Sequence, residues 1–139
     1  MSARLILVHK QPVSARTRFL RYEHGVIAPE PLPALSQVLE EDELAGSAVV
    51  LEHPAMLINR VTEGLGLAAS DLKLENEFRA FVDTPGGVVP IYLARIVTID
   101  PPFTVADKLG ARFIDITEAR DLGPAELDLL RRAYLCVME

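Results

Sequence analysis

The sequence predicts a single α+β domain over residues 1–139, with a mixed β-sheet of about five strands built around a central hairpin at 75–99 and covered by helices. Three observations favour this class. The 139 residues suit one domain by length, half of them are hydrophobic, and strand-like and helix-like apolar periods alternate along the chain.

The central hairpin is the clearest element in the sequence. Residues 77–83 alternate apolar and charged side chains, and residues 88–99 are rich in β-branched and aromatic types, so both segments favour strands. The turn between them, at 84–87, has a proline followed by two glycines, which suits a hairpin with a glycine bulge. The second strand is apolar on both sides, so we expect it to be central.

We expect a three-residue loop at 85–87, which fixes the register of this hairpin. Phe81 then lies opposite Ile91, and Glu77 opposite Arg95. One face would be dry and consist of Phe78, Ala80, Val82, Tyr92, Ala94 and Ile96. The other face would mix apolar and charged side chains and could be covered by a partner, so it gives the candidate interaction face: Arg79, Phe81, Ile91, Leu93 and Arg95.

The first 24 residues predict a strand followed by a helix. The apolar run from Leu5 to His9 predicts a short interior strand. For residues 15–24 we prefer a helix, because Ser14 is a good N-cap and Gly25 a good C-terminal stop. The alternative is a strand, which would make the N-terminal part of the chain a second hairpin.

The middle of the chain predicts a loop, two helices and a strand. Three alternating prolines in residues 26–33 indicate a connection along the surface. Residues 35–44 have helical spacing and end in a solvated acidic run, and the apolar residues in 47–52 predict a buried strand. A helix should begin at Pro54 and end at the Gly64 to Gly66 region.

The end of the chain predicts a helix, a strand, a helical turn and a closing helix. These elements fall at 104–110, 112–116, 117–120 and from Pro124 onward. The last helix should bury a stripe of Leu127, Leu130, Ala133, Tyr134, Val137 and Met138.

Charge and composition limit the classes of partner and compartment. Residues 1–22 carry five basic side chains and no acidic one, although the whole chain has a net charge of −6 and a pI near 5.1. A nucleic-acid-binding domain is normally basic, so nucleic acid is an unlikely partner. No apolar run approaches the ~20 residues of a membrane span, and the lone Cys136 suits a reducing compartment, so we expect a cytoplasmic protein.

The sequence contains no strong catalytic or metal-binding signature. It lacks a phosphate loop, a zinc-binding histidine pair and a nucleophile elbow, and Gly64 to Ala69 is better explained as the end of a helix than as a dinucleotide loop. Its three histidines lie at the ends of different elements. We therefore expect no cofactor and no metal site.

The best candidate for a small-ligand site is the corner after the first strand. If Ser14 caps a helix, the free amides of the helix end would point towards Lys10, and Arg16 and Arg18 would add positive charge. Such a corner would bind a phosphate or a carboxylate. The competing interpretation is that these arginines are solvated and pair with acidic residues elsewhere.

Two functions of different classes follow from these patterns. The preferred one is a non-enzymatic binding or assembly module that contacts another protein or a second copy of itself through the hairpin face. The alternative is a small enzyme or regulator that binds an anionic metabolite at the Lys10–Arg18 corner. A pocket lined by His9, Lys10 and the Ser14 amides would favour the alternative.

Overall fold

Seven strands form one mixed sheet in the part of the chain that the structure, a computed structural model, describes: residues 3–40 and 54–138. The strands are β1 Arg4–Lys10, β2 Thr17–Arg21, β3 Gln37–Val38, β4 Leu72–Leu74, β5 Ala80–Thr84, β6 Gly87–Ile96 and β7 Arg112–Ile114. The helices are α2 Ala55–Leu65, α3 Phe103–Lys108 and α4 Pro124–Met138. The predicted α+β class is confirmed, with seven strands instead of about five.

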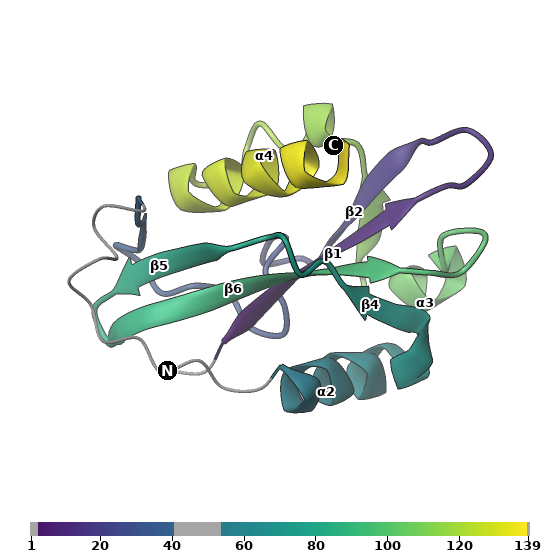
Figure 1. Cartoon of the computed structure of the whole chain (residues 1–139), viewed down its shortest axis with the longest axis horizontal. Coiled ribbons are helices and arrows are strands. Elements are labelled where there is room, and N and C mark those ends of the chain that lie inside the picture. The colour runs from purple at the N-terminus through teal and green to yellow at the C-terminus, as the bar shows by residue number, and fades with distance from the viewer. Residues whose placement is uncertain (1–2, 41–53, 139) are drawn as a thin grey trace.

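Strand β6 is the longest strand and lies at the centre of the sheet (Figure 1). The strand order is β3-β5-β6-β1-β2-β7, and β4 also pairs with β6. On one edge β6 pairs antiparallel with β5 over 87–91 and with β4 over 94–96. On the other edge it pairs in parallel with β1, so both strands that we expected to be interior are interior.

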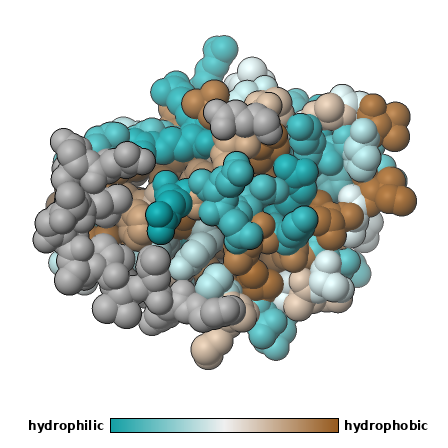
Figure 2. Space-filling model, in the orientation of Figure 1, coloured by the Kyte–Doolittle hydropathy of each residue, from teal (hydrophilic) through white to brown (hydrophobic). Residues whose placement is uncertain are grey.

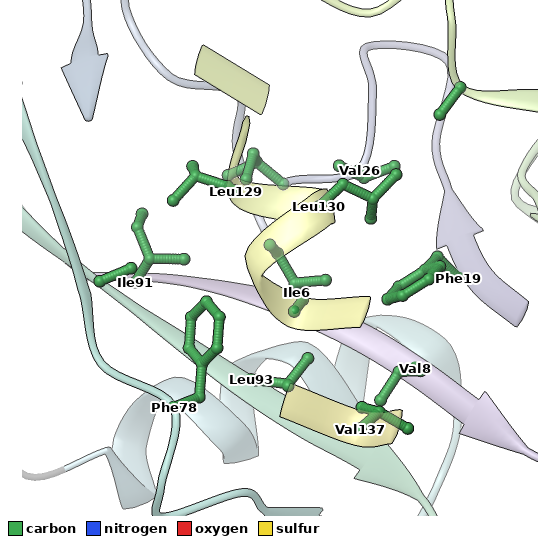
Figure 3. Packing of buried hydrophobic residues seen from close by; sticks show 14 of the residues in the cluster. Ile6, Val8, Phe19, Val26, Phe78, Ile91, Leu93, Leu129, Leu130 and Val137 are labelled. Atoms are coloured by element: carbon green, nitrogen blue, oxygen red, sulfur yellow. The ribbon is translucent and has the colours of Figure 1, made fainter. Parts of the chain in front are cut away.

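The sheet separates two hydrophobic cores. In Figure 1, α4 lies on one side of the sheet and α2 on the other. The core under α4 contains Ile6, Val8, Phe19, Ile91, Leu93, Leu129, Leu130 and Val137, as Figure 3 shows. The core under α2 and α3 contains Leu5, Leu7, Leu20, Ala94, Ile96, Leu57, Val61, Leu65 and Ala106. Each fully buried leucine or isoleucine stabilises the fold by about 1.5–3 kcal/mol.

The hairpin register differs by one residue from the prediction. Thr84 pairs with Gly87 and Phe81 with Pro90, because the turn has two residues and not three. The Thr84 hydroxyl tightens this turn, since it donates a hydrogen bond to the Gly87 carbonyl (2.6 Å) and accepts one from the Gly86 amide (3.2 Å). Side chains alternate between the two faces of a sheet. A shift of one residue therefore changes which side chains of the two strands lie on the same face.

This shift divides the candidate interaction face between the two sides of the sheet. Ile91 and Leu93 lie in the core under α4 together with Phe78, Ala80, Val82 and Val89. Phe81 occupies an alternate position of β5 and therefore faces the other side, and Arg79 lies in the connection before β5. The five predicted residues do not form one exposed face, because Ile91 and Leu93 are 2% and 1% exposed.

The expected ion pair between Glu77 and Arg95 is also replaced. The partner of Arg95 is Glu75, with 2.9 Å between Arg95 Nε and Glu75 Oε1. The contact is electrostatic, because Arg95 Nε makes no hydrogen bond.

Residues 15–24 do not form the helix that we preferred. They contain β2, which pairs antiparallel with β1, so the alternative of a second hairpin is correct. Phe19 and Leu20 are both fully buried but enter different cores, which is the two-residue alternation of a strand. Both cores therefore favour the strand over the helix.

Two further segments differ from the predictions. The described part of the predicted helix at 35–44 is extended, with Gln37–Val38 paired to β5 as β3; the rest of that helix and the strand at 47–52 lie outside the described residues. The loop at 26–33 is not all on the surface. Val26 to Ala28 are fully buried, and Ala28 exchanges two backbone hydrogen bonds of 2.8 Å with Leu5.

The helices agree well with their proline and glycine signals. Helix α2 begins after Pro54 and ends at Gly66, whose φ of 70° is left-handed, and α4 begins at Pro124. The buried stripe of α4 is Leu129, Leu130, Ala133 and Val137, while Leu127 and Tyr134 are only partly buried and Met138 is exposed. None of the helices in the described ranges combines the length and hydrophobicity that a membrane span requires.

Gly25 joins the turn after β2 to the first turn of α4. Its φ is 132°, and it exchanges backbone hydrogen bonds with Tyr22. The next residue, Val26, donates its amide proton to Glu126 Oε1 at 2.9 Å. A Cβ atom on Gly25 would meet the Glu126 carboxylate. The turn therefore requires glycine for both its backbone conformation and its space.

We expect Gly25→Ala to lower the free energy of unfolding by about 1–3 kcal/mol, because alanine is strained at this φ and displaces Glu126. Gly64→Ala is the matched control. Gly64 lies in α2 with no atom near the position of an added Cβ. Alanine favours a helix more than glycine does, so this variant should raise the free energy of unfolding by up to about 1 kcal/mol. Urea unfolding measures both; equal changes in the two variants would contradict the role of Gly25.

Candidate functional site

The four residues of the predicted anion corner lie along the β1–β2 hairpin. Lys10 ends β1, Ser14 and Arg16 lie in the turn, and Arg18 is on β2. No helix begins at Ser14, so the free helix amides on which the corner depended are replaced by a hairpin turn. The Ser14 hydroxyl accepts a hydrogen bond from the Arg16 amide at 3.3 Å.

Each cation of this corner has a partner within the protein. Arg16 binds Asp115 with two hydrogen bonds of 3.1 and 3.3 Å, and this contact raises the pKa of Arg16 and lowers that of Asp115. Lys10 Nζ donates to the Val137 carbonyl at 3.4 Å.

Arg18 is also held within the hairpin end. It donates to Gln11 Oε1 at 3.1 Å, and its guanidinium lies 5.6 Å from the centre of the Phe103 ring. The positive charge of the corner is therefore largely used in contacts within the chain.

His9 is completely buried at the end of β1. Its Nε2 lies 2.7 Å from the Thr98 carbonyl, and because a carbonyl oxygen only accepts, Nε2 carries the proton. The other ring nitrogen, Nδ1, makes no hydrogen bond. His9 does not line either of the two clefts described below.

A cleft of about 190 Å³ lies where the chain leaves the sheet between β4 and β5. The intervening residues 75–79 form a turn, in which the Phe78 amide donates to the Glu75 carbonyl at 3.1 Å. The Glu75 amide donates to Leu93 of β6 at 2.9 Å, so the turn stays attached to the sheet edge. The cleft is lined by Pro54, Leu74, Glu75, Asn76, Phe78, Arg79, Ala80, Phe81, Pro90, Ile91 and Tyr92.

The strand pairing explains why two aromatic rings meet at this cleft. Phe81 on β5 pairs with Pro90 on β6. Tyr92 lies two residues beyond Pro90, so Phe81, Pro90 and Tyr92 are on the same side of the sheet, and Arg79 lies in the connection just before β5. The cleft thus has a floor of half-buried rings with a guanidinium at its edge.

Arg79 is the electrostatic feature of the cleft. It is exposed and makes no ion pair or hydrogen bond with any residue in the described ranges. The acid that lines this cleft, Glu75, is paired with Arg95 at 2.9 Å. Among the described lining residues, the uncompensated charge is therefore positive, although the chain as a whole carries −6. Figure 2 shows hydrophilic surface over the β4–β5 connection, and hydrophobic surface towards the end that holds the β1–β2 hairpin.

A second cleft, of about 380 Å³, lies between the same turn and α4. It is lined by Glu77, Phe78, Arg79, Arg132, Leu135 and Cys136. Here Arg132 is occupied, since it contacts Asp128 at 3.0 Å and Glu40 at 2.7 Å, and the exposed Glu77 faces the same space as Arg79. This side is electrostatically balanced and suits an anion less well.

Sequence reasoning identified Arg79 and Phe81 but placed them on an interaction face with residues of the opposite side. It missed Tyr92 and Asn76 as lining residues. The usable signal was the change from the Leu72–Leu74 segment to the turn at 75–79, which marks a break in the sheet edge. Within the described residues, no group of three His, Cys, Asp or Glu side chains is placed to hold a metal ion.

Comparisons with known proteins give a weak structural likeness. No protein-family model and no curated protein sequence matches the chain. One solved structure that matches is the Ap4A hydrolase of C. elegans, at 16% sequence identity and a TM-score of 0.49, with 96% of each chain covered. At this level of similarity the comparison assigns no residue or substrate to this chain.

The structure corrects the function that we preferred from the sequence. We had predicted a non-enzymatic module for protein–protein contact through the hairpin face. The loss of the continuous interaction face, described above, removes the structural basis of the same prediction.

We expect Arg16→Ala to raise the pH at which Asp115 titrates. The hydrogen bond from Arg16 is the main cause that lowers the pKa of Asp115 below 3.8. Since the lowered pKa belongs to the folded state, the pair stabilises the fold above pH 3.8, and this contribution is lost as the pH falls through the lowered value. Carboxyl ¹³C NMR titration measures the midpoint. Asp121, whose pKa Arg21 lowers to about 2, is the internal reference and should not move. An unchanged Asp115 midpoint would refute the pairing.

Proposed function

We propose that this protein is a small enzyme or regulator that binds an anionic metabolite, carrying a phosphate or a carboxylate, in the cleft between β4 and β5. The observation that carries the proposal is Arg79. Its exposed guanidinium lines the cleft and has no acidic partner in the described residues. A guanidinium binds a carboxylate or phosphate through two parallel hydrogen bonds, which gives both energy and orientation.

The surroundings of Arg79 support an anion at this place. The acid that lines the same cleft, Glu75, is neutralised by Arg95. Pro54, which lines the cleft, precedes the first turn of α2, and that turn contains no acidic residue. The positive end of the α2 dipole therefore adds to the charge of Arg79.

The Lys10–Arg18 corner fits an anion less well than this cleft. Arg16 would have to leave Asp115, and neither described cleft includes Lys10, Ser14, Arg16 or Arg18. The proposal therefore keeps the predicted class of ligand, an anion, and places its binding site at Arg79 instead of at the Lys10–Arg18 corner.

A thermal-shift screen of the full chain against inorganic phosphate, sugar phosphates and organic acids tests the proposal, because a ligand of the native state raises the unfolding temperature. We expect at least one class to bind. Arg79→Gln should then weaken binding about tenfold or more, since a hydrogen bond to a charged group contributes ~1.5–3 kcal/mol.

Two variants serve as controls for the Arg79 substitution. Arg112→Gln removes an exposed arginine of β7, far along the sheet order from the cleft, and should leave binding unchanged. Arg18→Gln tests the predicted corner. A ligand that depends on Arg18 and not on Arg79 would place the site in the hairpin, and a panel without any binder would overturn the proposal.

A further inference from the structure

We infer that the ligand of the β4–β5 cleft is a molecule with a single flat ring and one carboxylate or phosphate group. This inference rests on the proposed function, and it adds the shape and the charge of the ligand. Three properties of the cleft lead to it: its volume, its aromatic side chains and its number of cations.

The volume limits the ligand to about one ring. Cavities of about 150 Å³ hold a benzene molecule, and sites for drug-sized ligands have ~300–1,000 Å³. The volume of the cleft, about 190 Å³, is slightly larger than the cavity that holds benzene and smaller than a site for a drug-sized ligand. It can therefore hold a ring with a small substituent, and a larger ligand would leave most of its surface in water.

The side chains favour a flat and aromatic group. Phe81 and Tyr92 are both half-buried, and each presents a ring to the cleft beside the apolar Leu74 and Pro90. Rings pack on one another in offset or edge-to-face geometry, and such a pair adds ~0.5–1.5 kcal/mol beyond the burial of its area. Asn76, exposed at the rim, offers an amide that can bond to a polar ring substituent.

The charges favour a single anionic group. Among the described lining residues Arg79 is the one cation, and it can satisfy one carboxylate or one phosphate. A diphosphate or triphosphate would bring further negative charge that finds no second cation among the described lining residues, into the field of a chain with a net charge of −6. Extra phosphates should therefore add no affinity.

Isothermal titration of the full chain with a matched set of probes tests the inference. Benzoate and phenyl phosphate carry the ring, acetate and inorganic phosphate carry only the anion, and ADP and ATP carry a larger base and several charges. We expect phenyl phosphate to bind at least tenfold tighter than inorganic phosphate, and neither ADP nor ATP to bind tighter than phenyl phosphate.

Substitutions at Phe81 separate the role of the ring from that of the anion. Phe81→Leu should weaken the binding of phenyl phosphate about three- to tenfold and leave the binding of inorganic phosphate unchanged. Phe81→Tyr should keep the affinity of the wild type for both. Phe103→Leu is the control, because Phe103 is an exposed aromatic residue that does not line the cleft. If Phe81→Leu does not fold, NMR contacts between the phenyl protons and Tyr92 of the wild type replace it.

The outcomes distinguish this inference from the proposed function. Anions that bind through Arg79 without any gain from the ring, or a nucleotide that binds more than tenfold tighter than phenyl phosphate, would overturn the single-ring ligand and leave the anion site intact. Absence of the Tyr92 contacts would do the same. If no probe binds, both are wrong.

Discussion

The parallel pairing of β1 with β6 is the interaction on which the rest of the structure depends. Both strands are apolar on their two sides, so each can bury its side chains only in the middle of a sheet that is covered on both faces. Ile6 and Leu93 supply the core under α4, and Leu5 and Ala94 the core under α2 and α3. The remaining strands extend this pair outward, and the helices cover the two surfaces that it creates.

The parts of the fold that were predicted correctly are those with local signals. Pro54 and Gly66 define α2, Pro124 defines α4, and the apolar run of β1 can only be a buried strand. The segment predicted as a helix at 15–24, and the described part of the one predicted at 35–44, contain the strands β2 and β3 because of partners distant in sequence. Their apolar spacing satisfied a helix equally well, and pairing with β1 and with β5 decided the outcome.

The site was only partly predictable for the same physical reason. The anion corner required a helix at Ser14; in the hairpin that forms instead, Arg16 is held by Asp115, which lies about a hundred residues away in sequence. Arg79 and Phe81 were identified as candidates, but a turn of two residues instead of three separated them from Ile91 and Leu93. Side chains in a sheet alternate with a period of two, so an error of one residue in loop length changes which residues share a face. Phe81 was therefore predicted on a protein-binding face, whereas in the structure it lines a cleft.

The interruption of the sheet edge between β4 and β5 has a consequence for how the protein can change. The side chains at its rim, such as Asn76 and Arg79, are exposed and belong to neither core, whereas the strand beneath them is fixed by pairing on both edges. Substitutions at this rim alter shape and charge without removing buried contacts. In the proposed cleft, ligand preference is therefore separated from stability, and new specificities can arise on the same scaffold without a compensating gain elsewhere.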